Sequence, residues 1–213
     1  MKKQLLNIWI LVVRAYRAFI MPSFYKLWLS SYGKNVILRG PLNYISLRKV
    51  TLGDNTAIMP HFSMISAGGH FIMKRNSGTA KNLLVITGNH ERILGEPVVK
   101  KGGTGRDIDE EDDIIVEEDV WIGANVTLCH GAHLSRGTTV GAGSVVRSKT
   151  PPYAIVIGNP AKIVGFNYTP DEIIEHEKKI YPESERISKL LLEKNYEKYF
   201  INRIEEIKQF TKL

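Results

Sequence analysis

The sequence predicts a mainly β protein, a parallel β-helix with a helical segment at each end. Three observations indicate this fold. A period of six residues runs between positions 116 and 151, the period stops after Gly165, and an amphipathic helical pattern covers the first thirty residues. The chain of 213 residues is 43% hydrophobic and 24% charged, an ordinary globular balance that argues against global disorder.

The repeat has an aliphatic residue at every sixth position and a small or β-branched residue four positions later. The aliphatic residues are Val116, Ile122, Leu128, Leu134, Val140 and Val146, and the smaller ones are Val120, Val126, Ala132, Thr138, Ser144 and Thr150. Six residues turn an α-helix through about 600°, which would scatter these side chains around its whole surface. A fixed period of six instead suits short strands separated by corners, with one aliphatic side chain per repeat in a central core.

Residues 52–63 have the same pattern, but the phase is lost between them and residue 116, so this interval must contain excursions. Residues 82–87 still indicate a buried strand. Two stretches rich in Gly, Lys and Asp, about 68–81 and 91–114, are expected to be loops. The expected division is an amphipathic helical segment over 1–32, a β-helix domain over 33–166 and a helical tail over 167–213.

The amino-terminal segment is basic and apolar at once. The first fifty-three residues carry nine basic side chains and no acidic one, and the longest apolar run, residues 8–13, is too short to span a bilayer. Arg14 and Arg17 stand where a signal peptide needs small residues. Two interpretations stay open: a helix packed on protein, or peripheral membrane contact through residues 1–30 with anionic lipid. Nucleic acid is not an expected partner, because no recognition motif is present.

The tail begins with a helix signal. Thr169 can cap a helix that starts with Pro170 and two acidic residues, and this helix should end near Ile180, before Pro182. A second helix is expected from about Glu183. The single cysteine, Cys129, rules out a disulfide framework and makes a reducing compartment the default.

The motifs WIGANV, GAGSVV, the Pro-Pro pair and GNPAKIV follow one another between residues 119 and 164. This stretch closely resembles the hexapeptide-repeat acyltransferases, left-handed parallel β-helix enzymes related to galactoside, maltose and serine acetyltransferases. The resemblance implies left-handed winding, acetyl-CoA as acetyl donor, and a homotrimer with its sites at subunit interfaces. The stretches IMK and TGNHER, with the basic helix, resemble members that O-acetylate sugars of bacterial surface polysaccharides.

His90 is the candidate general base. Acyl transfer to a hydroxyl needs a base near neutral pKa, and Thr87-Gly88-Asn89-His90 ends a buried strand at the start of a charged loop. In the family, the matching histidine takes the acceptor's proton and the hydroxyl attacks the thioester directly, so Cys129 need not act as nucleophile. Asn89 is a candidate contact for the acceptor. His70, which also follows two glycines, is the rival base.

The same resemblance implies donor contacts at five positions. Small residues let pantetheine approach the backbone, and basic residues meet the nucleotide phosphates. The matching residues are Ala124, Ala142, Arg147, Ser148 and Lys162. The alternative for the two alanines is purely structural, since small residues also serve the fold at corners.

No metal is expected. A carbonic anhydrase of the same fold needs three histidines converging on zinc, and His130 and His133 lack the spacing of that family. The sequence therefore predicts an acetyl-CoA-dependent O-acetyltransferase acting on a sugar hydroxyl in surface polysaccharide biosynthesis. We expect it in the cytoplasm, at the inner face of the membrane. An amino-sugar N-acetyltransferase and a non-catalytic β-helix scaffold remain the alternatives.

Overall fold

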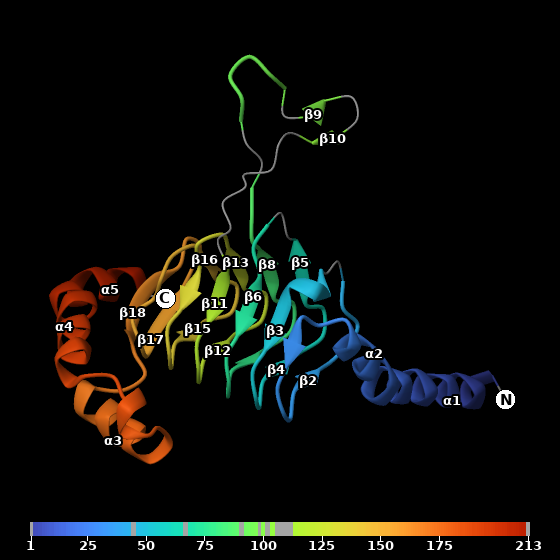
Figure 1. The fold of residues 1–213 in the computed structure, drawn as a ribbon, viewed down its shortest axis with the longest axis horizontal. Helices are drawn as coiled ribbons and strands as arrows, with labels where there is room; N and C mark the ends of the chain where they lie inside the picture. The colour runs from blue at the N-terminus through green and yellow to red at the C-terminus, as the bar shows by residue number, and fades with distance from the viewer. Residues whose placement is uncertain are drawn as a thin grey trace.

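The computed structural model describes residues 2–43, 46–65, 68–89, 92–97, 99–100, 103–104 and 113–211. Short strands wind into a stack of coils, and each coil contributes to three sheets (Figure 1). Sheet A holds β1 (Ser31–Tyr32), β3 (Val50–Leu52), β6 (Phe71–Met73), β11 (Ile114–Val116) and β14 (His133–Leu134). Sheet B holds β2 (Ile37–Leu38), β4 (Ala57–Ile58), β7 (Gly78–Thr79), β12 (Trp121–Ile122), β15 (Thr139–Val140), β17 (Ala154–Ile157) and β18 (Lys162–Phe166). Sheet C holds β5 (Ser63–Ile65), β8 (Leu84–Ile86), β13 (Thr127–Cys129) and β16 (Val145–Val146).

Strands within these sheets pair in parallel, except for β18, which folds back antiparallel on β17. We call the turns from sheet B to sheet C the B/C edge, and the turns from sheet C to the next sheet A strand the C/A edge. These two edges border sheet C and carry the candidate site.

The repeat positions form the core, as the sequence predicts. The six aliphatic residues from Val116 to Val146 are each at most 2% exposed, and the six smaller residues from Val120 to Thr150 at most 4%. Each six-residue repeat thus places one aliphatic and one small side chain inside, and three repeats make one coil, which is why the period of six persists.

The expectation of a loop over residues 68–81 is wrong. This stretch contains β6 and β7, which complete a regular coil. The coil is hard to recognise because two of its core positions are polar: Ser77 and Thr79 are at most 2% exposed. The Ser77 hydroxyl donates to the Glu117 carbonyl at 2.7 Å and accepts from the Val120 N–H at 3.0 Å, so its burial leaves no polar group unpaired.

The expected excursion after residue 91 leaves the stack between β8 and β11. Among its described residues, β9 (Val99–Lys100) and β10 (Gly103–Thr104) pair antiparallel. This hairpin stands clear of the coils in Figure 1. The chain rejoins the stack at Asp113, immediately before β11.

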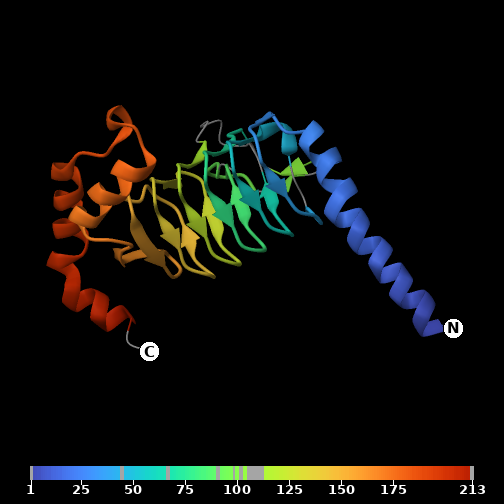
Figure 2. The ribbon, with the colours of Figure 1, turned by 90° about the horizontal axis from the view of Figure 1, so that it is seen from below.

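The amino-terminal helix continues past Pro22 to Leu27. It consists of α1 (Lys2–Ala15), a π-helical turn (Tyr16–Ile20) and α2 (Met21–Leu27). Pro22 lies in the first turn of α2, immediately after the π-helical turn. Figure 2 shows α1 pointing away from the stack. Among the helices of the described residues, none is long and apolar enough to cross a membrane.

The helical tail covers the other end of the stack (Figure 1). It contains α3 (Pro170–Ile180), a 3-10 turn (Glu183–Glu185), α4 (Lys189–Tyr199), a 3-10 turn (Ile201–Arg203) and α5 (Ile204–Thr211). Thr169 and Glu172 form the predicted capping box at the start of α3. The second helix begins later than Glu183, because Ser188 supplies its cap. Tyr153, Ile173 and Leu192 form the small core between the last coil and the tail.

Candidate active site

The C/A edge brings His70 and Asp113 together from neighbouring coils. Asp113 Oδ1 lies 3.2 Å from His70 Nδ1 and also accepts the His70 backbone N–H at 2.7 Å. The imidazole is 51% exposed. In the tautomer that donates from Nδ1, the exposed Nε2 carries the lone pair, which is the arrangement of a general base held by a carboxylate. The sequence singled out His70 as a rival base but gave no sign of its partner.

Asn89 lies exposed on the same edge, three residues after β8. His90, the candidate base, lies outside the described residues, so its role remains a prediction. Two further histidines differ from each other: His130, which follows β13, is half-buried, and His133, in β14, has its Nε2 2.7 Å from Glu117 Oε1.

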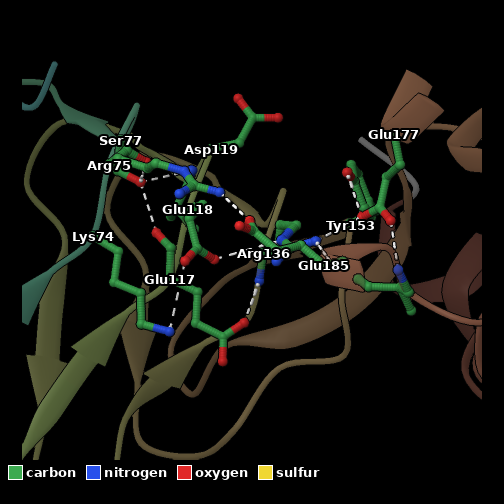
Figure 3. Close-up of polar contacts among 12 residues, drawn as sticks. Lys74, Arg75, Ser77, Glu117, Glu118, Asp119, Arg136, Tyr153, Glu177 and Glu185 are labelled. Atoms are coloured by element: carbon green, nitrogen blue, oxygen red, sulfur yellow. Dashed lines mark hydrogen bonds and ion pairs between the residues drawn. The ribbon is translucent and has the colours of Figure 1, made fainter. Parts of the chain in front are cut away.

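Glu117 belongs to a charged cluster at the turns from sheet A to sheet B (Figure 3). Burial alone would raise the pKa of Glu117. Hydrogen bonds from His133 and from the Arg136 N–H, with the nearby Lys74 cation, nevertheless hold that pKa below its ordinary value. His133 is therefore engaged with a carboxylate on the surface of sheet A. Among the described residues, no three His, Cys, Asp or Glu side chains are grouped to hold a metal ion.

Four of the five candidate donor residues lie at the two edges of sheet C. Ala124 and Ala142 occupy successive coils at the B/C edge, where the Gly143 N–H donates to the Ala124 carbonyl at 2.8 Å. Arg147 and Ser148 follow β16 at the opposite edge. Residues 158–161 run beside β16 and form hydrogen bonds with both the N–H and the carbonyl of Val145. Lys162, which follows them, therefore lies one layer further along the stack.

Close coil packing at the B/C edge explains part of this pattern without any ligand. A Cβ on Gly123 would lie 2.6 Å from the Ala142 nitrogen, so the fold itself requires a glycine there. Ala142 is different, because its side chain is exposed and its small size is not imposed by the neighbouring coil.

Ser148 and Lys162 line one pocket of about 240 Å³ between the last coils and the tail. The pocket also contains Lys149 and Arg203, so three cationic side chains meet there. Arg203 is paired with the Glu206 carboxylate at 2.9 and 3.0 Å, and Lys162 Nζ lies 4.9 Å from the Phe210 ring centre. Sequence reasoning missed Lys149 and Arg203, since no motif marks a basic residue on a distant helix that folds back.

Cys129 lies beside Arg147, because β13 and β16 pair in register. Burial raises the pKa of the Cys129 thiol, and the Arg147 cation offsets only part of that increase. A thiol that stays protonated is a poor nucleophile, which agrees with direct transfer and no acyl-enzyme.

Comparison with known families agrees with this repeat geometry. Residues 113–148 match the bacterial transferase hexapeptide family, described as six repeats. These residues of the chain therefore carry the repeat of the hexapeptide transferases. The resemblance inferred from the motifs is thereby confirmed.

Two curated relatives of this hexapeptide-repeat protein illustrate the match. A probable macrolide acetyltransferase of Lysinibacillus sphaericus is 32% identical over 122 residues, which cover 57% of this chain and 66% of the relative. The putative lipopolysaccharide biosynthesis O-acetyl transferase WbbJ of Escherichia coli K12 is 29% identical over 133 residues, covering 62% and 58%. The chain thus spans about three fifths of the length of these relatives.

Solved structures share the fold. The hexapeptide-repeat acetyltransferase VCA0836 of Vibrio cholerae, complexed with acetyl-CoA, superposes with a TM-score of 0.58 at 22% identity over 68% of this chain and 75% of its own. Galactoside acetyltransferase in complex with coenzyme A superposes with a TM-score of 0.59 at 18% identity, covering 78% and 76%.

Proposed function

We propose that the protein is an acetyl-CoA-dependent O-acetyltransferase that acts on a sugar hydroxyl in surface polysaccharide biosynthesis. One observation carries this proposal: four of the five donor residues named from the motifs lie at the two edges of sheet C, and the fifth, Lys162 at the start of β18, lines a pocket with Ser148 and two further cations. Coenzyme A carries its chemical groups in a matching order along its length. Its neutral pantetheine arm would lie on the backbone at Ala124 and Ala142, and its phosphates would meet Lys162.

Charge at the phosphate end supports this direction of binding. Lys149, Lys162 and Arg203 line the pocket together. Hydrogen bonds to charged groups contribute about 1.5–3 kcal/mol each, so these cations are the strongest expected contacts of the donor. Arg147 and Ser148, at the C/A edge, would meet the donor between its two ends.

His90 is the proposed base, and it follows Asn89 of the C/A edge in the sequence. The imidazole takes the proton of the sugar hydroxyl as its oxygen bonds to the thioester carbonyl carbon. A backbone N–H of a coil stabilises the resulting oxyanion. Collapse breaks the carbon–sulfur bond, coenzyme A leaves as its thiolate, and the imidazolium returns the proton to it. Asn89 would hold the acceptor.

Several further properties belong to the proposal. The coils wind with left-handed sense, and the chain forms a homotrimer with its sites at subunit interfaces. The division into residues 1–32, 33–166 and 167–213 and a cytoplasmic location at the inner face of the membrane are proposed with it. The family resemblance supports the winding and the trimer, and the single cysteine agrees with a reducing compartment.

Release of free coenzyme A thiol tests the activity. The full chain is incubated with acetyl-CoA and a panel of sugars and nucleotide sugars, and the thiol is followed with a chromogenic reagent. We expect acceptor-dependent release and a product that loses its acetyl group in mild base, as an ester does. A base-stable amide would show N-acetylation instead. Absence of acceptor-dependent release with every sugar would contradict the proposal.

Lys162→Ala tests the donor site in the same assay. Loss of one phosphate contact should raise the KM for acetyl-CoA about tenfold with little change in kcat. Lys179→Ala, an exposed lysine of α3 outside this pocket, is the matched control and should leave both constants unchanged. An unchanged KM in Lys162→Ala would show that the phosphates bind elsewhere.

A further inference from the structure

The first helix of the chain exposes nearly all of its apolar surface. None of the residues of α1 is buried. Leu5, Trp9 and Leu11 are 60%, 64% and 62% exposed, and Leu6, Ile8, Ile10 and Val12 are also among the exposed large hydrophobics. In both views α1 extends away from the coils (Figures 1 and 2). Exposed contiguous apolar surface of this kind marks an interaction site.

The apolar side chains occupy most of the circumference of α1. At 100° per residue, Lys3, Arg14, Asn7 and Gln4 fall within about 100°, with Leu11 among them. The other apolar residues span roughly 220°, an arc that Lys2 in the first turn interrupts. A partner helix covers only a narrow seam, whereas a lipid interface can receive so wide an apolar face.

The charge of this region complements an anionic partner. Residues 1–53 contain nine Lys and Arg and no Asp or Glu. Arg14 lies in the last turn of α1, Arg17 follows in the π-helical turn, and Lys26 lies in the last turn of α2. Parallel packing of the same helix from a second copy would bring these cations together, so like-charge repulsion opposes that arrangement.

The base of the helix is fixed to the coils while α1 is not. Tyr25 of α2 and Leu29 pack against the core of the first coils, and Arg48 lies 5.4 Å from the Trp28 ring centre. A Cβ on Gly40 would lie 3.2 Å from Tyr25 Cε2 and 3.4 Å from Met21 Cε, which shows how closely α2 approaches the stack. Membrane contact through α1 therefore leaves the coil stack intact.

We propose that α1 lies in the interface of an anionic membrane, with its apolar face among the acyl chains and its basic residues at the headgroups. With its 14 residues, α1 is about 21 Å long, which suits an interfacial helix and is too short for a span. This inference is independent of the acetyl transfer proposed above, because none of the donor or base candidates lies in α1.

Vesicle co-sedimentation of the full chain tests it. We expect strong binding to vesicles of phosphatidylcholine with phosphatidylglycerol, weak binding to phosphatidylcholine alone, and weakening at high salt. Arg14→Gln with Arg17→Gln should lower the partition coefficient roughly fivefold per charge, since each cation contributes about 1 kcal/mol near an anionic surface. Trp9→Glu with Val12→Glu should abolish binding.

The control is Leu190→Glu, an equally exposed apolar position of α4 (77%), which should bind as the parent does. All of the substituted side chains are exposed, so we expect each variant to fold as the parent does. As a second readout, the variant with Trp28→Phe and Trp121→Phe keeps Trp9 as its tryptophan, whose emission should shift to the blue on anionic vesicles. Equal binding by the Trp9→Glu, Val12→Glu variant would overturn the proposal. A parent protein that does not bind anionic vesicles would also overturn it. If the parent's mass by light scattering also falls on the Trp9→Glu, Val12→Glu substitution, a second copy covers α1 instead of lipid.

Discussion

The hydroxyl of Tyr153 donates to Oε1 of Glu177 across 3.1 Å, and both side chains are fully buried. The same carboxylate accepts from Arg136 Nη1 at 3.2 Å and, through Oε2, from the Ile187 N–H at 2.6 Å (Figure 3). Burial would lower the pKa of Arg136, but the Glu177 carboxylate raises it above its ordinary value, so the guanidinium stays charged. This single carboxylate joins the last coil to the helical tail.

Replacement of Glu177 should weaken the contact between the last coil and the helical tail. Glu177→Gln leaves the Arg136 cation, 12% exposed, without its buried counter-charge, and we expect about 3 kcal/mol less free energy of unfolding. Urea denaturation measures this change in the free energy of unfolding. Glu175→Gln, on the exposed face of α3, is the matched control and should change little. A Glu177→Gln variant as stable as the control would refute the role of this carboxylate.

Two buried tyrosines in this region predict opposite effects of the same substitution. Tyr153→Phe removes a hydrogen bond to a carboxylate and should destabilise by about 1.5 kcal/mol. The Tyr181 hydroxyl is buried and has no hydrogen-bond partner in the described part of the chain. Tyr181→Phe keeps the ring that faces Arg136 at 4.1 Å and should leave stability equal or about 1 kcal/mol higher. Thermal unfolding of both variants, side by side, checks the pair; a loss in Tyr181→Phe as large as in Tyr153→Phe would contradict it.

Glu117 predicts a pH dependence of stability. Its folded pKa is lowered from the ordinary value of 4.5, so its stabilising contribution is fully present above pH 4.5 and is lost as pH falls through the lower folded value. Glu117→Gln should therefore lose less stability than the parent between pH 5 and pH 3. Urea unfolding at several pH values in this range measures the difference. Parallel curves for parent and variant would exclude this contribution.

The sequence predicted the regular part of the fold because one aliphatic side chain in every six-residue repeat must fill the core. From Val116 to Thr150 every core position is apolar or small, so the period is visible. The prediction failed over residues 68–81, where Ser77 and Thr79 are buried with their hydrogen bonds satisfied. A pattern of hydrophobicity cannot reveal a polar residue whose partner lies on another coil.

The candidate site was predicted in part for the same kind of reason. Motif positions such as Ala142 and Lys162 follow the local backbone and could be named in advance. The neighbours of these residues come from elsewhere: Asp113 reaches His70 after the long excursion, and Arg203 joins Lys162 from the tail. Such pairs depend on tertiary packing, which leaves no periodic signal in the sequence.

The choice of base can be decided by two substitutions. If His90 takes the proton, His90→Ala should lower kcat by about 10²–10⁴ with a modest effect on the KM for acetyl-CoA. His70→Ala should retain most of the activity. Steady-state kinetics with the acceptor identified in the thiol-release assay gives both values. Full activity in His90→Ala and loss in His70→Ala would assign the base to the His70–Asp113 pair instead.

Calorimetric titration of the protein with coenzyme A tests the central claim, that sheet C and its edges bind the donor. We predict saturable binding by the parent and its loss in Ala142→Trp, because a large exposed side chain would occupy the path of the pantetheine arm. Lys81→Trp, at the same edge two coils earlier and exposed as well, should bind as the parent does. Binding that survives in Ala142→Trp, or no binding by the parent at millimolar coenzyme A, would contradict the account.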